Sequence, residues 1–78
     1  MARLEIPSPR GHDVIEFDRT ADESHPAVKD AMRAFNELVN EHKMLAVTKN
    51  PGDADYTTVK NFKDVQEQTT FKRQLQGG

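Results

Sequence analysis

The chain has 78 residues, 35% of them hydrophobic and 31% charged, with a mean hydropathy of -0.84, and this limits it to one small domain. Its 11 basic and 13 acidic residues give a net charge of -2, whereas a general nucleic-acid binder carries a positive excess to contact phosphates. No apolar run approaches the ~18 residues of a membrane span. No secretory signal pattern is visible, and without cysteine there is neither a disulfide framework nor a thiolate metal site. We therefore expect a cytoplasmic protein that neither enters membranes nor depends on nucleic acid as its main partner.

Two short strands are predicted near the N-terminus. Residues 3–6 alternate between polar and apolar side chains, and residues 13–18 resume the same period of two, which is typical of half-buried strands. Val14 is an apolar residue on the polar face of the second strand, and we expect this strand to lie at an edge of the sheet. Residues 7–11 contain two prolines and a glycine and are predicted to form the loop between the strands.

An amphipathic helix from Pro26 to about His42 is the clearest element of the chain. Its apolar residues recur at steps of three and four and form one stripe, and Pro26 suits the first helical turn. Asp22 or Ser24 is expected to cap the helix by accepting hydrogen bonds from the free amides of that turn. The stripe consists of Val28, Ala31, Met32, Phe35, Leu38, Val39 and His42.

The sequence of the second half of the chain predicts a hairpin, followed by a segment that fits two kinds of secondary structure. Residues 43–48 carry apolar side chains on both faces, as in a central strand. The Asn-Pro-Gly sequence within residues 49–53 predicts a turn, and residues 55–62 form the returning strand. Residues 63–78 fit either a weak helix or a strand. The paired threonines favour a strand over 68–73, followed by a flexible tail at 74–78.

These elements predict an α+β fold in a single domain over residues 1–73. One helix packs on a four- or five-stranded sheet in a two-layer sandwich of order ββαββ, with a fifth strand if residues 68–73 are extended. The predicted core consists of Leu4, Ile6, Ile15, Phe17, Val28, Met32, Phe35, Leu38, Val39, Leu45, Val47, Val59 and Phe62.

The residue pattern contains no recognisable catalytic constellation. His12, His25 and His42 are too far apart in sequence for a local metal motif, and neither serine lies in a nucleophile elbow. No glycine-rich loop precedes the helix, so no phosphate-binding motif is present. We therefore expect a protein that is not an enzyme and that uses no metal or other cofactor.

One predicted strand carries a pattern that could contact nucleic acid. Tyr56, Thr58, Lys60 and Phe62 would share one face of the strand over residues 55–62, and an exposed aromatic ring beside lysine can stack on bases. The favoured alternative places Phe62 in the core and Tyr56 at an edge. The basic residues available to such a surface are Lys60, Lys63, Lys72 and Arg73.

The sequence finishes with Arg73-Gln74-Leu75-Gln76-Gly77-Gly78. A Gly-Gly pair has no side chains and can thread a narrow channel. This leucine-bearing ending resembles the tail of ubiquitin-like modifiers of the β-grasp fold, and the predicted element order is similar to that fold. Gln76 departs from the resemblance, because the modifiers most often carry arginine or a small residue there. The chain also resembles small uncharacterised bacterial and phage proteins with the same ending.

Three functions follow as hypotheses. The first is a non-catalytic protein-interaction or structural module, of bacterial or phage origin, that binds a protein partner or itself through a sheet edge or the tail. The second, implied by the resemblance, is a modifier or sulfur carrier that reacts at Gly78, although a frayed end or a cloning remnant would also explain the glycines. The third is a small nucleic-acid-associated regulator. The candidate partner-binding residues are Leu75, Gln76, Gly77, Gly78, Tyr56, Lys60, Lys72 and Arg73.

Overall fold

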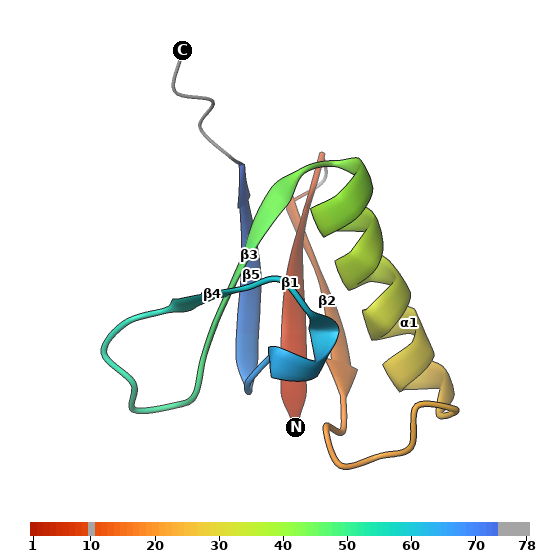
Figure 1. Ribbon diagram of the computed structural model, residues 1–78. Coiled ribbons are helices and arrows are strands. Elements are labelled where there is room, and N and C mark those ends of the chain that lie inside the picture. Colours follow the sequence, from red (N-terminus) through yellow and green to blue (C-terminus); the bar gives the residue numbers. More distant parts are fainter. Residues whose placement is uncertain (10, 74–78) are drawn as a thin grey trace.

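The computed structural model describes residues 1–9 and 11–73. Its elements are β1 (Ala2–Ser8), β2 (Gly11–Phe17), α1 (Pro26–Asn36), a π-helical turn η1 (Glu37–Glu41), β3 (Met44–Lys49), β4 (Thr57–Val59), a 3-10 turn η2 (Phe62–Asp64) and β5 (Gln68–Arg73). The five strands form one sheet in the order β2-β1-β5-β3-β4. β1 and β5 are parallel and the other neighbours are antiparallel. Figure 1 shows α1 lying along one side of this sheet, which confirms the predicted two-layer α+β fold. Of the two predicted strand numbers, four or five, the sheet has five.

No helix in the described part of the chain is both long enough and apolar enough to cross a membrane.

The N-terminal hairpin is longer than its sequence pattern indicated. Pro7 and Ser8 belong to β1 and not to a loop, so the predicted start of the loop at residue 7 is wrong. The backbone N–H of Arg3 donates to the Glu67 carbonyl on the β5 side at 2.9 Å, and strand alternation points position 7 toward the same side. Pairing between β1 and β5 stops at Glu5, so Pro7 withholds no hydrogen bond that this sheet needs.

The predicted helix is confirmed in extent, because α1 continues without a break into η1. Its predicted caps are wrong. The N-cap is His25, whose Nδ1 accepts a hydrogen bond from the Ala27 amide at 3.2 Å. Asp22 is engaged earlier, because its carboxylate accepts from the Ser24 amide at 3.0 Å and so closes a turn ahead of the helix.

The core forms where the helix meets aromatic side chains from both halves of the sheet. Phe35 is fully buried, and its ring centroid lies 5.8 Å from those of Phe62 and Phe71. Leu4, Phe17 and Val28 of the predicted core are also buried, and further predicted members pack against them. The buried hydrophobic residues absent from the prediction are Ala2, Ala31, Ala46, Val65 and Phe71.

The predicted burial of Val47 in β3 is confirmed, but β3 meets the helix with its other face. Ala46 belongs to the core cluster under the helix and is the cross-strand partner of Phe71 and Val59. Val47 is buried and Leu45 half-buried, but alternation places both on the opposite side of the sheet. Both faces of this strand are apolar, so its own sequence does not indicate which one meets the helix.

The predicted hairpin is confirmed, because β4 pairs antiparallel with β3, but the returning strand is shorter than the predicted 55–62 and covers only Thr57–Val59. The chain then turns through η2, where the Asp64 amide donates to the Asn61 carbonyl at 3.0 Å. This turn brings Phe62 into the core, 5.3 Å from the ring of Phe17. The strand predicted at 68–73 is confirmed as β5, and the alternative weak helix is wrong. The tail predicted at 74–78 lies outside the described residues.

Two threonines form a buried polar contact between β3 and β5. Thr48 and Thr69 are 1% and 2% exposed, and their hydroxyl oxygens lie 2.9 Å apart. The Thr48 hydroxyl also donates to the Gln68 carbonyl at 2.9 Å and accepts from the Gln66 amide at 2.7 Å. One hydroxyl therefore ties the start of β5 to β3.

We predict that Thr48→Val lowers the free energy of unfolding by about 1–3 kcal/mol, because the substitution leaves buried polar groups without a partner. Thr48→Ser keeps the hydroxyl and is the matched control. Urea denaturation followed by circular dichroism measures both variants. A Thr48→Val protein as stable as the parent would show that these hydrogen bonds contribute nothing net.

Candidate functional site

In the part of the chain that the structure describes, β2 forms the longer of the two sheet edges. β2 has seven residues and stands at one end of the strand order. Among residues 1–9 and 11–73, only β1 pairs with it. An unpaired edge presents backbone donors and acceptors that another strand can use.

The register shows which residues of β2 point their backbone groups outward. The Arg3 amide bonds toward β5, so alternation turns Leu4 toward β2. Leu4 pairs with Ile15, whereas Arg3 pairs with Glu16. The backbone N–H and C=O groups of Ile15 therefore form hydrogen bonds with β1, whereas those of Glu16 point away from β1. The same alternation leaves the N–H and C=O groups of His12, Val14 and Glu16 without a partner strand among residues 1–9 and 11–73, and this row of residues is called the outer edge below.

The side chains of the outer edge all lie on the sheet face opposite the helix. Their cross-strand partners Arg3 and Glu5 alternate with the buried Leu4, so this row belongs to the open face. Val14 is 41% exposed, which confirms its predicted position on the polar face of an edge strand. The outer edge thus combines free backbone groups with an apolar side chain between His12 and Glu16.

The opposite edge of the sheet offers much less. β4 has three residues, and the exposed Lys60 follows it directly. Short edge strands and lysine at an edge both hinder pairing with another chain. The two edges therefore differ, and β2 is the better candidate for a binding surface.

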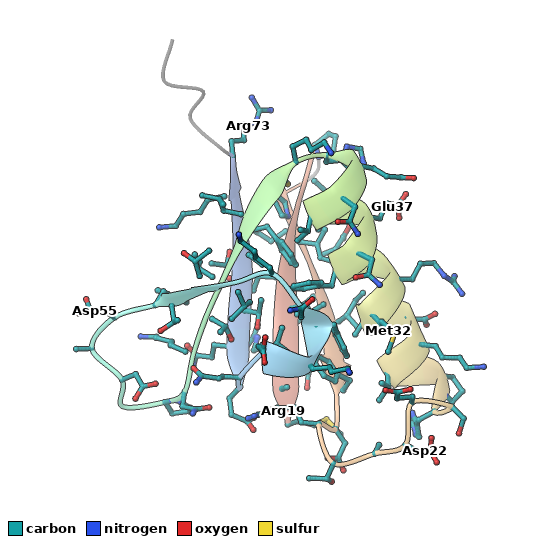
Figure 2. All side chains as sticks on the ribbon, in the orientation of Figure 1. Arg19, Asp22, Met32, Glu37, Asp55 and Arg73 are labelled. Carbon is teal, nitrogen blue, oxygen red and sulfur yellow. The ribbon has the colours of Figure 1, made fainter. Side chains whose placement is uncertain are left out.

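The described candidate residues from the sequence do not form one surface. Tyr56 is 45% exposed, and the Lys49 ammonium lies 5.1 Å from its ring centroid. Lys72 pairs with Leu45 on the open face, whereas Arg73 alternates to the helix side. Figure 2 shows Asp55, next to Tyr56, on the loop beside the sheet and Arg73 at the far end of β5.

The remaining candidates Leu75, Gln76, Gly77 and Gly78 lie outside the described residues. Phe62 does not share a face with Tyr56, because η2 turns it into the core. The four basic residues named for nucleic acid are also divided, since Lys63 lies in η2 while Lys72 lies on the open face.

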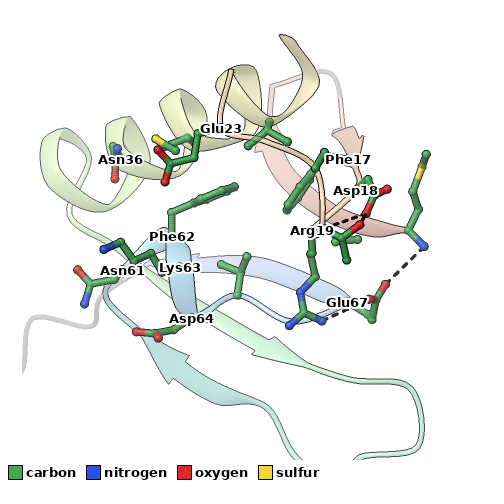
Figure 3. Close-up of a pocket in the computed structure, with 17 residues that line it drawn as sticks. Phe17, Asp18, Arg19, Glu23, Asn36, Asn61, Phe62, Lys63, Asp64 and Glu67 are labelled. Atoms are coloured by element: carbon green, nitrogen blue, oxygen red, sulfur yellow. Dashed lines mark hydrogen bonds and ion pairs between the residues drawn. The ribbon is translucent and has the colours of Figure 1, made fainter. Parts of the chain in front are cut away.

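A cleft of about 1050 Å³ opens between α1, η2 and the loop after β2. Figure 3 shows Phe17 and Phe62 inside it, with charged side chains around them. Glu67 pairs with Arg19 at 3.3 Å and with the amino group of Met1 at 3.5 Å. These ion pairs neutralise part of the rim, so the cleft is an aromatic hollow bordered by paired charges. Sequence reasoning missed it, because its residues come from distant segments.

Asp18 at the rim of this cleft has a pKa below its ordinary value of 3.8. The causes are hydrogen bonds donated to its carboxylate by the Thr20 hydroxyl at 2.7 Å and the Thr20 amide at 2.9 Å. Both bonds stabilise the ionised form. The lowered pKa thus reflects a turn that leads from β2 toward α1.

A second group of polar side chains lies at the end of the helix. The carboxylates of Glu37 and Glu41 and the imidazole of His42 have ligand atoms within 4.8 Å of one another. All three residues are exposed. The spacing of the histidines in the sequence did not predict this group. Exposed carboxylates commonly lie this close together without binding an ion.

No protein-family model, curated protein or solved structure matches the chain. The class defined by its topology is a β-grasp-like α+β domain, in which β1 and β5 are parallel at the centre of a mixed sheet.

We predict that Thr20→Val raises the pKa of Asp18, because it removes the hydroxyl that contributes most to the lowering. A carboxylate with a lowered pKa stabilises the folded state above the unfolded pKa, and this stabilisation is lost as the pH falls through the folded value. The variant should therefore lose it at a higher pH than the parent. An NMR titration of the Asp18 side-chain carbon measures the pKa, and an unchanged value would contradict this assignment.

Proposed function

We propose that this protein is a non-catalytic interaction module that binds an extended segment of a protein partner along the outer edge of β2. The observation that carries the proposal is the row of outward backbone groups at His12, Val14 and Glu16. These residues belong to β2, which is held in an extended conformation by its pairing with β1. A partner strand would continue the sheet by main-chain hydrogen bonding, while its side chains would provide specificity.

The open face supports this proposal. An added strand would place alternate side chains beside Val14, which is exposed although it is apolar. Further into the sheet, Glu5 and Thr70 follow Val14 across the strands, and Val47 is buried at the centre of that face. A partner could therefore bury Val14 between the polar side chains of His12 and Glu16.

We predict that Val14→Pro abolishes this binding without unfolding the protein. Proline removes an N–H that points outward and blocks the approach of a strand, but it costs no hydrogen bond within the sheet. Ile15→Pro is the contrasting variant, because its N–H points toward β1 and its loss should destabilise the fold. Val14→Thr keeps the β-branched shape and the N–H and serves as the positive control.

A displayed library of short random peptides provides the binding test. Selected peptides should perturb the NMR amide signals of His12, Val14 and Glu16, and Val14→Pro should abolish their binding. Peptides that bind the folded Val14→Pro variant as tightly as the parent, or that perturb only the cleft residues, would contradict the proposal.

A second candidate function is that of a ubiquitin-like modifier or sulfur carrier. The β-grasp-like strand order and the Gly77-Gly78 pair favour it together. Incubation with ATP and candidate activating enzymes should then yield an adenylate or conjugate at Gly78, detectable by mass spectrometry. Deletion of Gly77 and Gly78 should abolish that product, whereas Val14→Pro should leave it unchanged. Conjugation that survives the deletion would rule out this function.

A further inference from the structure

We propose that the strand that binds the outer edge of β2 is β2 of a second copy of this chain, antiparallel to the first, with Val14 on the two-fold axis. This inference rests on the proposed function and names its partner. A two-fold axis brings a surface into contact with an identical copy of itself. The row His12, Val14, Glu16 must therefore be complementary to the same row running in the opposite direction. The spacing of the outer-edge residues can be tested for that property.

The free backbone groups restrict the registers that two β2 strands can adopt. In an antiparallel pair, residues with outward groups must face residues with outward groups. With Val14 on the axis, Val14 faces Val14 of the second copy, and His12 faces Glu16 of the second copy. All three outward residues of each strand are then used: the Val14–Val14 contact occurs once, on the axis, and the His12–Glu16 contact occurs twice, once on each side of it.

Neighbouring registers oppose like groups or leave groups unused. An axis at Asp13 sets two Asp13 carboxylates against each other, and an axis at Glu16 does the same for two Glu16 carboxylates. An axis at Ile15 sets Glu16 against Val14 and leaves His12 without an outer-edge partner. Like charges directly opposite each other destabilise a strand pair. Val14 is therefore the axis position at which the polar groups at both ends are complementary.

The residues behind the edge fit this arrangement. Glu16 of β2 stands opposite Arg3 of β1 in the strand register, and the Arg3 guanidinium lies 3.8 Å from the Glu5 carboxylate on the same face. The imidazole of His12 from the second copy would approach the Glu16 carboxylate from the outer side. The Glu16 carboxylate would then accept a hydrogen bond from an imidazole N–H of the second copy. On the helix-side face, Asp13 faces Ile15 of the second copy, so no two carboxylates oppose each other there. The product is a continuous sheet made of two five-stranded halves.

A cysteine at the axis tests the register directly, because the chain has no cysteine of its own. In Val14→Cys, the two thiols of a dimer would face each other at a separation that a disulfide can span. His12→Cys is the matched control, because its two copies would lie about four residues apart along the strands, roughly 13 Å. Under mild oxidation, Val14→Cys should form a disulfide-linked dimer and His12→Cys should not.

The polar contacts give an independent test. His12→Glu sets two carboxylates against each other at both ends of the pair and should weaken dimerisation about tenfold or more. His12→Glu combined with Glu16→Lys sets a carboxylate against an ammonium group at both ends and should recover the affinity. Sedimentation equilibrium over a series of protein concentrations measures each variant, and circular dichroism shows that each remains folded.

The outcomes separate this inference from the proposed function. A parent protein that stays monomeric at every concentration, or a disulfide that forms as readily in His12→Cys as in Val14→Cys, would overturn the self-pairing. If Val14→Pro still abolished peptide binding in that case, the outer edge would remain a binding site for another chain. If Val14→Pro abolished neither dimers nor peptide binding, both proposals would fail.

Discussion

The fold depends on the short parallel ladder between β1 and β5. Within the described residues it is the only strand pairing between the N-terminal hairpin and the C-terminal strands, and it spans three residue pairs, from Arg3 to Glu5 on the β1 side. So short a ladder needs support from packing. The aromatic cluster supplies it, because Phe35 contacts Phe71 of β5 while Phe62 contacts both Phe35 and Phe17 of β2. The helix therefore holds together two sheet halves that share little backbone.

Buried hydrogen bonds of the Thr48 hydroxyl help to fix the position of β5 between β1 and β3. The Thr48 hydroxyl binds backbone groups of Gln66 and Gln68 just before β5 and at its start. A displacement of β5 along β3 would separate these partners. Hydrophobic contacts alone tolerate small shifts better than directional hydrogen bonds do. The position of β5 beside β1, and with it the orientation of the N-terminal hairpin, thus depends in part on one buried side chain.

The elements with a local signal could be predicted from the sequence, and those that depend on distant neighbours could not. The stripe of α1 repeats at helical spacing, and the alternating residues of β5 include two threonines, so both were found. The inward face of β3 depends on its register with Phe71, which no pattern within residues 43–48 contains. Val14 on the polar face indicated an edge strand, but the outward direction of its backbone groups needed the pairing of β1 with both neighbours. The sequence-based candidates around Tyr56 and Arg73 share no surface for the same reason.

Pro7 has a consequence for the accuracy of folding. It lies in β1 just beyond the last pair with β5, on the side that faces β5. If the N-terminal hairpin shifted by two residues along β5 during folding, Pro7 would lie opposite β5 within the ladder. Proline has no backbone N–H to donate there. The misaligned sheet would then lack a hydrogen bond that the native sheet does not require. One imino acid at the end of a ladder thus disfavours a kinetic trap at no expense to the native structure.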